Sequence, residues 1–171
     1  LAGHLLGRRA RLGPMSEPTP CGLYRTSVAI PGAVPAGALV YFHNHGDPGP
    51  GVYLPREWRH NRAIFAERGT PVPDESYAAT LKRLPSEGFY RVVSPFFCCE
   101  RQCRRFEPEE LVQLGYNGAA RPILFLPELT AGLLTVPSSG TPVDDERLTQ
   151  LAPLRVAATT PPEAHPASTV N

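Results

Sequence analysis

Two histidines one residue apart, His43 and His45, are the side chains in this sequence best suited to chemistry. They close an apolar run, 38–42, that has the composition of a β-strand. Because side chains of a strand alternate between its two faces, both imidazoles are predicted to share one face. Imidazole nitrogens bind zinc, iron, nickel or copper, so the pair predicts a metal site. The alternative is a polar loop entry in which the rings hydrogen-bond to local carbonyls.

The segment from Gly37 to His45 resembles the opening of the cupin motif, in which a glycine and five further residues precede His-x-His. The resemblance implies a cupin-like metal-binding protein or metalloenzyme that uses His43 and His45, with zinc or iron as the cofactor. The family also has a glutamate shortly after the second histidine. Here that part of the chain leads into Gly49, Pro50 and Gly51, and the family's second motif is not found.

Three cysteines lie close together in the sequence, at Cys98, Cys99 and Cys103. Their spacings fall in the range of paired zinc ligands, and Cys21 could supply a fourth thiolate. In the alternative interpretation, one sulfur is a buried apolar group and the others are free thiols. Flanking arginines would lower a thiol pKa and so allow a redox-active cysteine; they are Arg101, Arg104 and Arg105.

Charge and motifs exclude several classes of function. The net charge is +1, which gives no overall footprint for nucleic acid. Phosphate-binding glycine loops and the G-x-S-x-G nucleophile motif are absent, and no carboxylate pair suits acid–base work. The longest uncharged run, 26–46, contains prolines and histidines that a membrane helix would not tolerate. We therefore expect no membrane span and favour a protein that is not an enzyme.

Proline determines the expected fold class. The chain has 21 prolines and 15 glycines spread along its length. Because a proline inside a helix costs about 3 kcal/mol, long helices are excluded. Short apolar runs separated by turn residues predict a mainly β protein with a minor helical part. We expect a small antiparallel β-barrel, or a pair of β-modules, with two to four short helices.

The first half of the chain is predicted to hold a meander followed by two helices. Strands are expected at 23–30, 38–45 and 51–55, with proline- and glycine-rich turns between them. A helix is expected over 55–68, where Trp58 and Phe65 would share a face. A second helix is expected over 75–84, with Asp74 as its N-cap.

The second half is predicted to return to strands. A strand over 88–99 should break at Pro95, and the pair Asn117-Gly118 should form a tight type I′ turn between 112–116 and 123–126. Further strands are expected at 132–137 and 154–157. Between them, Asp144 should cap a short helix over 145–151.

Three segments are expected along the chain. Residues 1–14 are interpreted as a flexible arm or a non-native extension, because the first methionine is Met15 and the early charges follow the apolar residues. Residues 15–156 are expected to form a single β-rich domain. Residues 157–171 lack large apolar side chains apart from Val170 and predict a disordered tail.

Together these patterns favour a non-catalytic, β-rich binding or assembly module of a bacterial cytoplasmic protein. Such a module needs no cofactor and would bind a protein partner or associate with itself. The alternative function is the cupin-like metal-binding protein or metalloenzyme built on His43 and His45. Metal analysis of the purified protein distinguishes the two.

Overall fold

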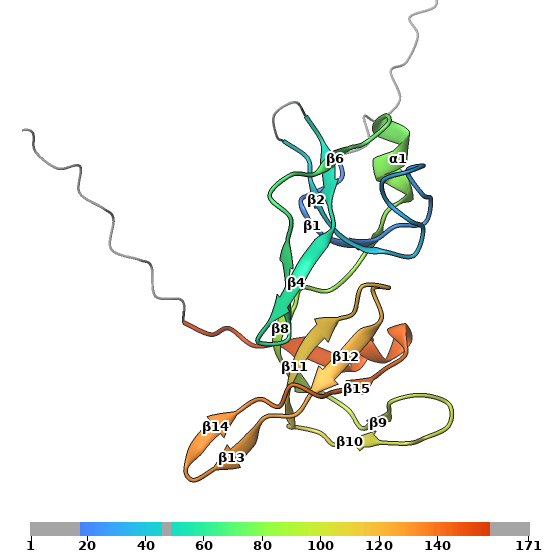
Figure 1. Cartoon of the computed structure of the whole chain (residues 1–171). Helices are drawn as coiled ribbons and strands as arrows, with labels where there is room; N and C mark the ends of the chain where they lie inside the picture. The colour runs from blue at the N-terminus through green and yellow to red at the C-terminus, as the bar shows by residue number, and fades with distance from the viewer. Residues whose placement is uncertain (1–17, 46–48, 158–171) are drawn as a thin grey trace, which may run out of the picture.

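The computed structural model describes residues 18–45 and 49–157 (Figure 1). Strands make up 42% and helical turns 9% of the described residues, so the predicted mainly β class is confirmed. The sheets are antiparallel, and the two helices are short. The expected arm at 1–14 lies outside the described residues, as does the expected tail except Ala157.

The first sheet confirms the predicted meander. Its strand order is β6-β3-β2-β1-β7, with every neighbouring pair antiparallel. The strands are β1 (Gly22–Arg25), β2 (Leu39–His43), β3 (Gly51–Tyr53), β6 (Thr70–Pro71) and β7 (Lys82–Arg83). Helix α1 (Glu75–Thr80) lies beside this sheet, in the upper part of Figure 1.

The second sheet has the order β15-β12-β11-β8-β16 and is also antiparallel. Its strands are β8 (Gly88–Val92), β11 (Leu111–Tyr116), β12 (Pro122–Phe125), β15 (Thr141–Pro142) and β16 (Leu151–Pro153). A 3₁₀ helix, η1 (Asp145–Gln150), precedes β16. The predicted strand at 154–157 is wrong, because the pairing with β8 occurs over 151–153 instead.

Three separate hairpins complete the fold. They are β4 (Pro55–Arg59) with β5 (Arg62–Phe65), β9 (Phe96–Phe97) with β10 (Arg105–Phe106), and β13 (Glu128–Thr130) with β14 (Leu133–Thr135). Within the described part of the chain, neither five-stranded sheet closes on itself. The barrel part of the fold prediction is therefore not confirmed.

The helix predicted over 55–68 is wrong, because this segment forms the β4–β5 hairpin. His60 and Asn61 occupy its turn with φ of 48° and 64°, the left-handed pair that a two-residue hairpin turn requires. The indole of Trp58 donates from Nε1 to the carbonyl oxygen of Tyr116 at 2.7 Å. Packing against β11 thus decides the structure of a segment whose apolar spacing also fits a helix.

The other two predicted helices are present but differ from expectation: the first is shorter, and the second is a 3₁₀ helix. Asp74 caps α1 as predicted, since its Oδ1 accepts the N–H of Tyr77 at 3.0 Å. The helix ends at Thr80 because the next residues pair with β1 as strand β7. Asp144 precedes η1, but its side chain makes no capping hydrogen bond.

The β11–β12 hairpin is present, with a different turn from the one predicted. Ala120, at φ 55°, is the left-handed residue, whereas Gly118 does not have a positive φ. The Asn117 Oδ1 accepts the N–H groups of Ala119 and Arg121 at 3.1 and 2.9 Å. This is the three-residue connection in which a left-handed residue follows a type I turn, not a type I′ turn.

Two groups of buried apolar side chains form the core, one within each sheet region. Leu39 of β2 is fully buried in the group that belongs to the second sheet. Its backbone N–H donates to the carbonyl oxygen of Gly118 at 2.9 Å. The turn of the β11–β12 hairpin therefore contacts the first sheet directly. No helix in the described ranges is long and apolar enough to cross a membrane.

Candidate metal centres

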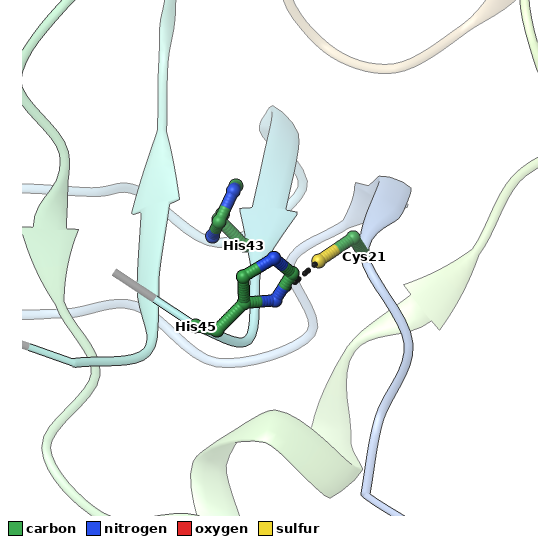
Figure 2. Close-up of side chains that lie close together, drawn as sticks. All are labelled: Cys21, His43 and His45. Carbon is green, nitrogen blue, oxygen red and sulfur yellow. Dashed lines mark hydrogen bonds between the residues drawn. The ribbon is translucent and has the colours of Figure 1, made fainter.

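Cys21, His43 and His45 meet at one end of the β1–β2 pair (Figure 2). His43 is the last residue of β2, and Cys21 directly precedes β1. Gly22 pairs with Phe42, so the antiparallel register places Cys21 across from His43. His45 follows two residues later and returns toward both side chains.

The three side chains offer ligand atoms that all lie within 4.8 Å of one another. The His43 and His45 rings have centroids 4.3 Å apart and are tilted by 51°. The Sγ of Cys21 is 3.6 Å from Nδ1 of His45. Cys21 and His43 are half-buried, whereas His45 is exposed, so the cluster is open to solvent on one side.

Asn44 organises this cluster from the middle of the His-Asn-His segment. Its backbone N–H donates to the Sγ of Cys21 at 3.3 Å, and the Cys21 thiol donates to Asn44 Oδ1 at 3.2 Å. The Asn44 side-chain Nδ2 donates in turn to the carbonyl oxygen of Thr19 at 3.1 Å. These bonds fix the cysteine beside the histidines.

The Nδ1 atom of His43 is buried and has no hydrogen-bond partner. Leaving a buried polar atom unsatisfied costs about 1–3 kcal/mol, so such an atom needs an explanation. The neighbouring rings are aromatic: Tyr41 and Tyr53 each lie with centroids 6.5 Å from that of His43. The aromatic neighbours hold the His43 ring in place without satisfying its nitrogen.

His43 and His45 lie side by side, but the strand predicted over 38–45 ends at His43, and His45 reaches the cluster from the bend that follows. Cys21, which the sequence allowed as a fourth ligand beside the other three cysteines, lies with the histidines instead. The pairing of β1, which begins after Cys21, with β2, which ends at His43, is what places Cys21 beside the histidines. A register, unlike a composition, is not visible in one strand alone.

Cys98, Cys99 and Cys103 form a second group, in the connection between β9 and β10. The Sγ of Cys99 lies 3.5 Å from that of Cys98 and 3.8 Å from that of Cys103. Cys98 is buried, Cys99 is half-buried and Cys103 is exposed. All four cysteines that the structure describes are free thiols.

Backbone donors surround these sulfurs. The N–H of Arg104 donates to Cys98 Sγ at 3.3 Å. The pKa of Cys99 is lowered, first by a hydrogen bond from the Cys103 backbone and next by the Cys98 thiol. The pKa of Cys103 is raised because its thiol is hydrogen-bonded to Cys99. Hydrogen bonds, rather than the arginine charges that the sequence suggested, therefore favour the Cys99 thiolate.

Two of the three flanking arginines lie over aromatic rings, whereas Arg101 lines the same hollow as the three cysteines. The guanidinium of Arg104 lies 5.7 Å from the centroid of Phe106, and that of Arg105 lies 5.9 Å from the centroid of Phe97. The three sulfurs instead border a hollow of about 950 Å³ between the β9–β10 connection and η1. Four carboxylates also line it: Glu100, Asp144, Asp145 and Glu146.

A larger hollow of about 1330 Å³ lies beside the β4–β5 hairpin and the second sheet. Two of its polar side chains are bonded, with Asn61 Nδ2 donating to Gln113 Oε1 at 3.0 Å and Gln113 Nε2 donating to the His60 carbonyl oxygen at 2.9 Å. These bonds join the hairpin turn to β11. We interpret this hollow as a packing feature.

Comparisons with protein-family models, with curated proteins and with solved structures each returned no match. We therefore infer the function from the arrangement of the side chains.

Proposed function

We propose that this protein binds a transition-metal ion of the zinc class through Cys21, His43 and His45. The observation that carries the proposal is their convergence, with ligand atoms all within 4.8 Å of one another. A zinc ion holds nitrogen and sulfur ligands at about 2.0–2.3 Å. Ligand atoms around one ion therefore lie closer to one another than the 4.8 Å limit that these three residues meet. The unsatisfied Nδ1 of His43 gives independent support.

The ligand set favours zinc over iron. One thiolate and two imidazoles are a combination that suits zinc, whereas the cupin resemblance implies a carboxylate beside the histidines. A tetrahedral ion with three protein ligands keeps a fourth position for water or another ligand, and the exposure of His45 leaves that side accessible.

Metal binding would also stabilise the fold at this end of the first sheet. Cys21 and His43 lie on neighbouring strands, and His45 follows where β2 has ended. An ion held by all three would join the segment before β1 to the segment after β2. Any ion that binds only the folded chain shifts the unfolding equilibrium toward the folded state.

The test is zinc binding by the full chain without a histidine tag, measured by competition with a chromophoric chelator. Relative to wild type, His43→Ala should lose one equivalent of bound zinc, and Cys21→Ser should weaken binding. His60→Asn is the matched control, because His60 is a histidine at a left-handed position that asparagine tolerates. Equal zinc content in wild type and His43→Ala would refute the proposal.

A second candidate function, self-association, is favoured by the β13–β14 hairpin, which projects from the molecule in Figure 1. Leu129 and Leu134 lie directly opposite each other on its strands and are 79% and 58% exposed. Both strands of this two-stranded sheet keep an unpaired outer edge. Such an edge pairs readily with the same edge of a second copy across a twofold axis.

Self-association is tested by the concentration dependence of the mass in analytical ultracentrifugation. The double variant Leu129→Ser with Leu134→Ser should remove the association seen with wild type. Val28→Ser is the control, since Val28 is 50% exposed and lies elsewhere on the surface. A wild-type protein that stays monomeric at every concentration would rule out this candidate.

A further inference from the structure

We propose that Cys98, Cys99 and Cys103 form a second, independent metal site for a thiophilic divalent cation such as Zn²⁺, with the Asp144 carboxylate as its fourth ligand. None of these residues belongs to the Cys21–His43–His45 cluster. Loss of binding at one site would therefore not count against the other site.

The distances between the sulfurs match a metal site. With Zn–S bonds of about 2.3 Å, two ligands of a regular tetrahedron lie about 3.8 Å apart. The Sγ atom of Cys99 is 3.5 Å from that of Cys98 and 3.8 Å from that of Cys103. A disulfide needs about 2.05 Å, so either pair of sulfurs would have to move much closer to form one.

The backbone holds the thiols in this arrangement without an ion. Gln102 adopts a left-handed conformation, φ 54°, and its N–H donates to the Cys99 carbonyl oxygen at 3.0 Å. That turn returns the chain so that Cys103 faces Cys99. The N–H of Arg104 then donates to Cys98 Sγ, a bond that stabilises negative charge on the sulfur. The ligands are thus positioned before binding, which lowers the ordering cost.

Asp144 is the carboxylate best placed to complete the site. Its backbone N–H donates to the Cys98 carbonyl oxygen at 3.0 Å, which holds it beside the thiols. Its side chain lines the same hollow and makes no capping bond to η1. Asp145, by contrast, is held by Arg25 and Lys82. The Asp144 carboxylate lines the hollow but does not lie within 4.8 Å of all three sulfurs, so its side chain would have to turn toward them to reach a zinc–oxygen distance of about 2.0–2.2 Å.

A bound ion would cross-link the β9–β10 connection to the start of η1. Strands β9 and β10 have two residues each, so few backbone bonds hold the long connection between them. An ion bound by its three cysteines and by Asp144 would link this connection to the start of η1.

The experiment uses Co²⁺ as a spectroscopic probe in place of zinc, under reducing conditions. The full chain carrying Cys21→Ser and His43→Ala, which disable the first site, should bind one equivalent and show a strong thiolate-to-cobalt charge-transfer band. Adding Cys103→Ser should abolish most of that band. Because Cys103 is exposed, its change to serine is not expected to disturb packing. Adding Asp144→Asn should weaken binding about tenfold while the band remains.

Three outcomes would overturn the site. One is the absence of a charge-transfer band in the Cys21→Ser, His43→Ala protein, with circular dichroism showing that it is folded. Another is a band that Cys103→Ser leaves unchanged. The third is a disulfide in place of a metal. Trypsin cuts after Arg101, between Cys99 and Cys103, so a disulfide from Cys103 to either neighbour joins two peptides that separate on reduction.

Discussion

The guanidinium of Arg25 binds the carboxylate of Asp145, 120 residues away in the sequence, through both of its terminal nitrogens. The Nη2–Oδ1 distance is 2.9 Å, and the same Nη2 donates to the carbonyl oxygen of Ala120 at 2.6 Å. Arg25 lies on β1, Ala120 in the β11–β12 turn and Asp145 at the start of η1. One side chain therefore joins the two sheets and the 3₁₀ helix.

Asp145→Asn should lower the free energy of unfolding by about 1 kcal/mol near neutral pH, the upper end for a partly exposed ion pair. The pKa of Asp145 is lowered to about 2, chiefly by the hydrogen bond from Arg25. A carboxyl group with a depressed folded pKa stabilises the fold above its unfolded pKa of about 3.9, and this contribution is lost as the pH falls through about 2. Urea denaturation at several acidic pH values measures the effect.

The control for this prediction is Glu107→Gln. Glu107 pairs with Arg105 at 2.9 Å, but both side chains are more than half exposed. We expect little change in stability from this control, because exposed pairs contribute little. Equal effects of the two variants would show that the Arg25–Asp145 pair has no special structural role.

Ala120, rather than Gly118, should be the sensitive position of the β11–β12 turn. Ala120 is fully buried and left-handed, so Ala120→Val adds both crowding and backbone strain. We expect a loss of roughly 2 kcal/mol or more. At Gly118 an added Cβ would meet Trp58 only at an ordinary 3.8 Å, so Gly118→Ala should be nearly neutral. Thermal melting that ranks the two variants in the opposite order would contradict this turn.

Gly115→Ala should loosen the β4–β5 hairpin from β11. A Cβ at position 115 would lie 2.4 Å from the backbone carbonyl oxygen of Asn61, closer than any real contact, so the hairpin must shift. Overpacking of this kind typically costs about 1–3 kcal/mol. Hydrogen exchange should show faster opening of 55–65 in the variant. A variant with wild-type stability and exchange would mean that the hairpin does not pack here.

Asn44→Ala should weaken zinc binding at the first site about tenfold, the usual effect of losing a group that positions a ligand. Asn44 is not counted among the ligands, but its side chain bonds to Cys21 and to the Thr19 carbonyl oxygen. Competition with a chelator gives the zinc affinity, and melting of the metal-free protein gives the structural cost. An unchanged zinc affinity in Asn44→Ala would show that Asn44 does not position the ligands.

Part of the candidate chemistry could be predicted from the sequence because it depends on local spacing. His43 and His45 are only one residue apart, and Cys98, Cys99 and Cys103 are close in sequence. The period of a strand does not explain the histidine pair, because His45 follows the end of β2. The cap at Asp74 and the meander of β1 to β3 also follow from local patterns. Cys21 could not be assigned, because its neighbours are set by the register between two strands.

The sequence by itself determined that the protein is mainly β, since its prolines exclude long helices and leave short strands between turns. Tertiary structure alone decided the segment 55–65, whose Trp58 and Phe65 fit one face of a helix as well as they fit a hairpin. The hairpin forms because Trp58 bonds to Tyr116 and because the backbone of Asn61 packs against Gly115. Contacts between residues more than fifty positions apart supply that free energy, and no local propensity encodes them.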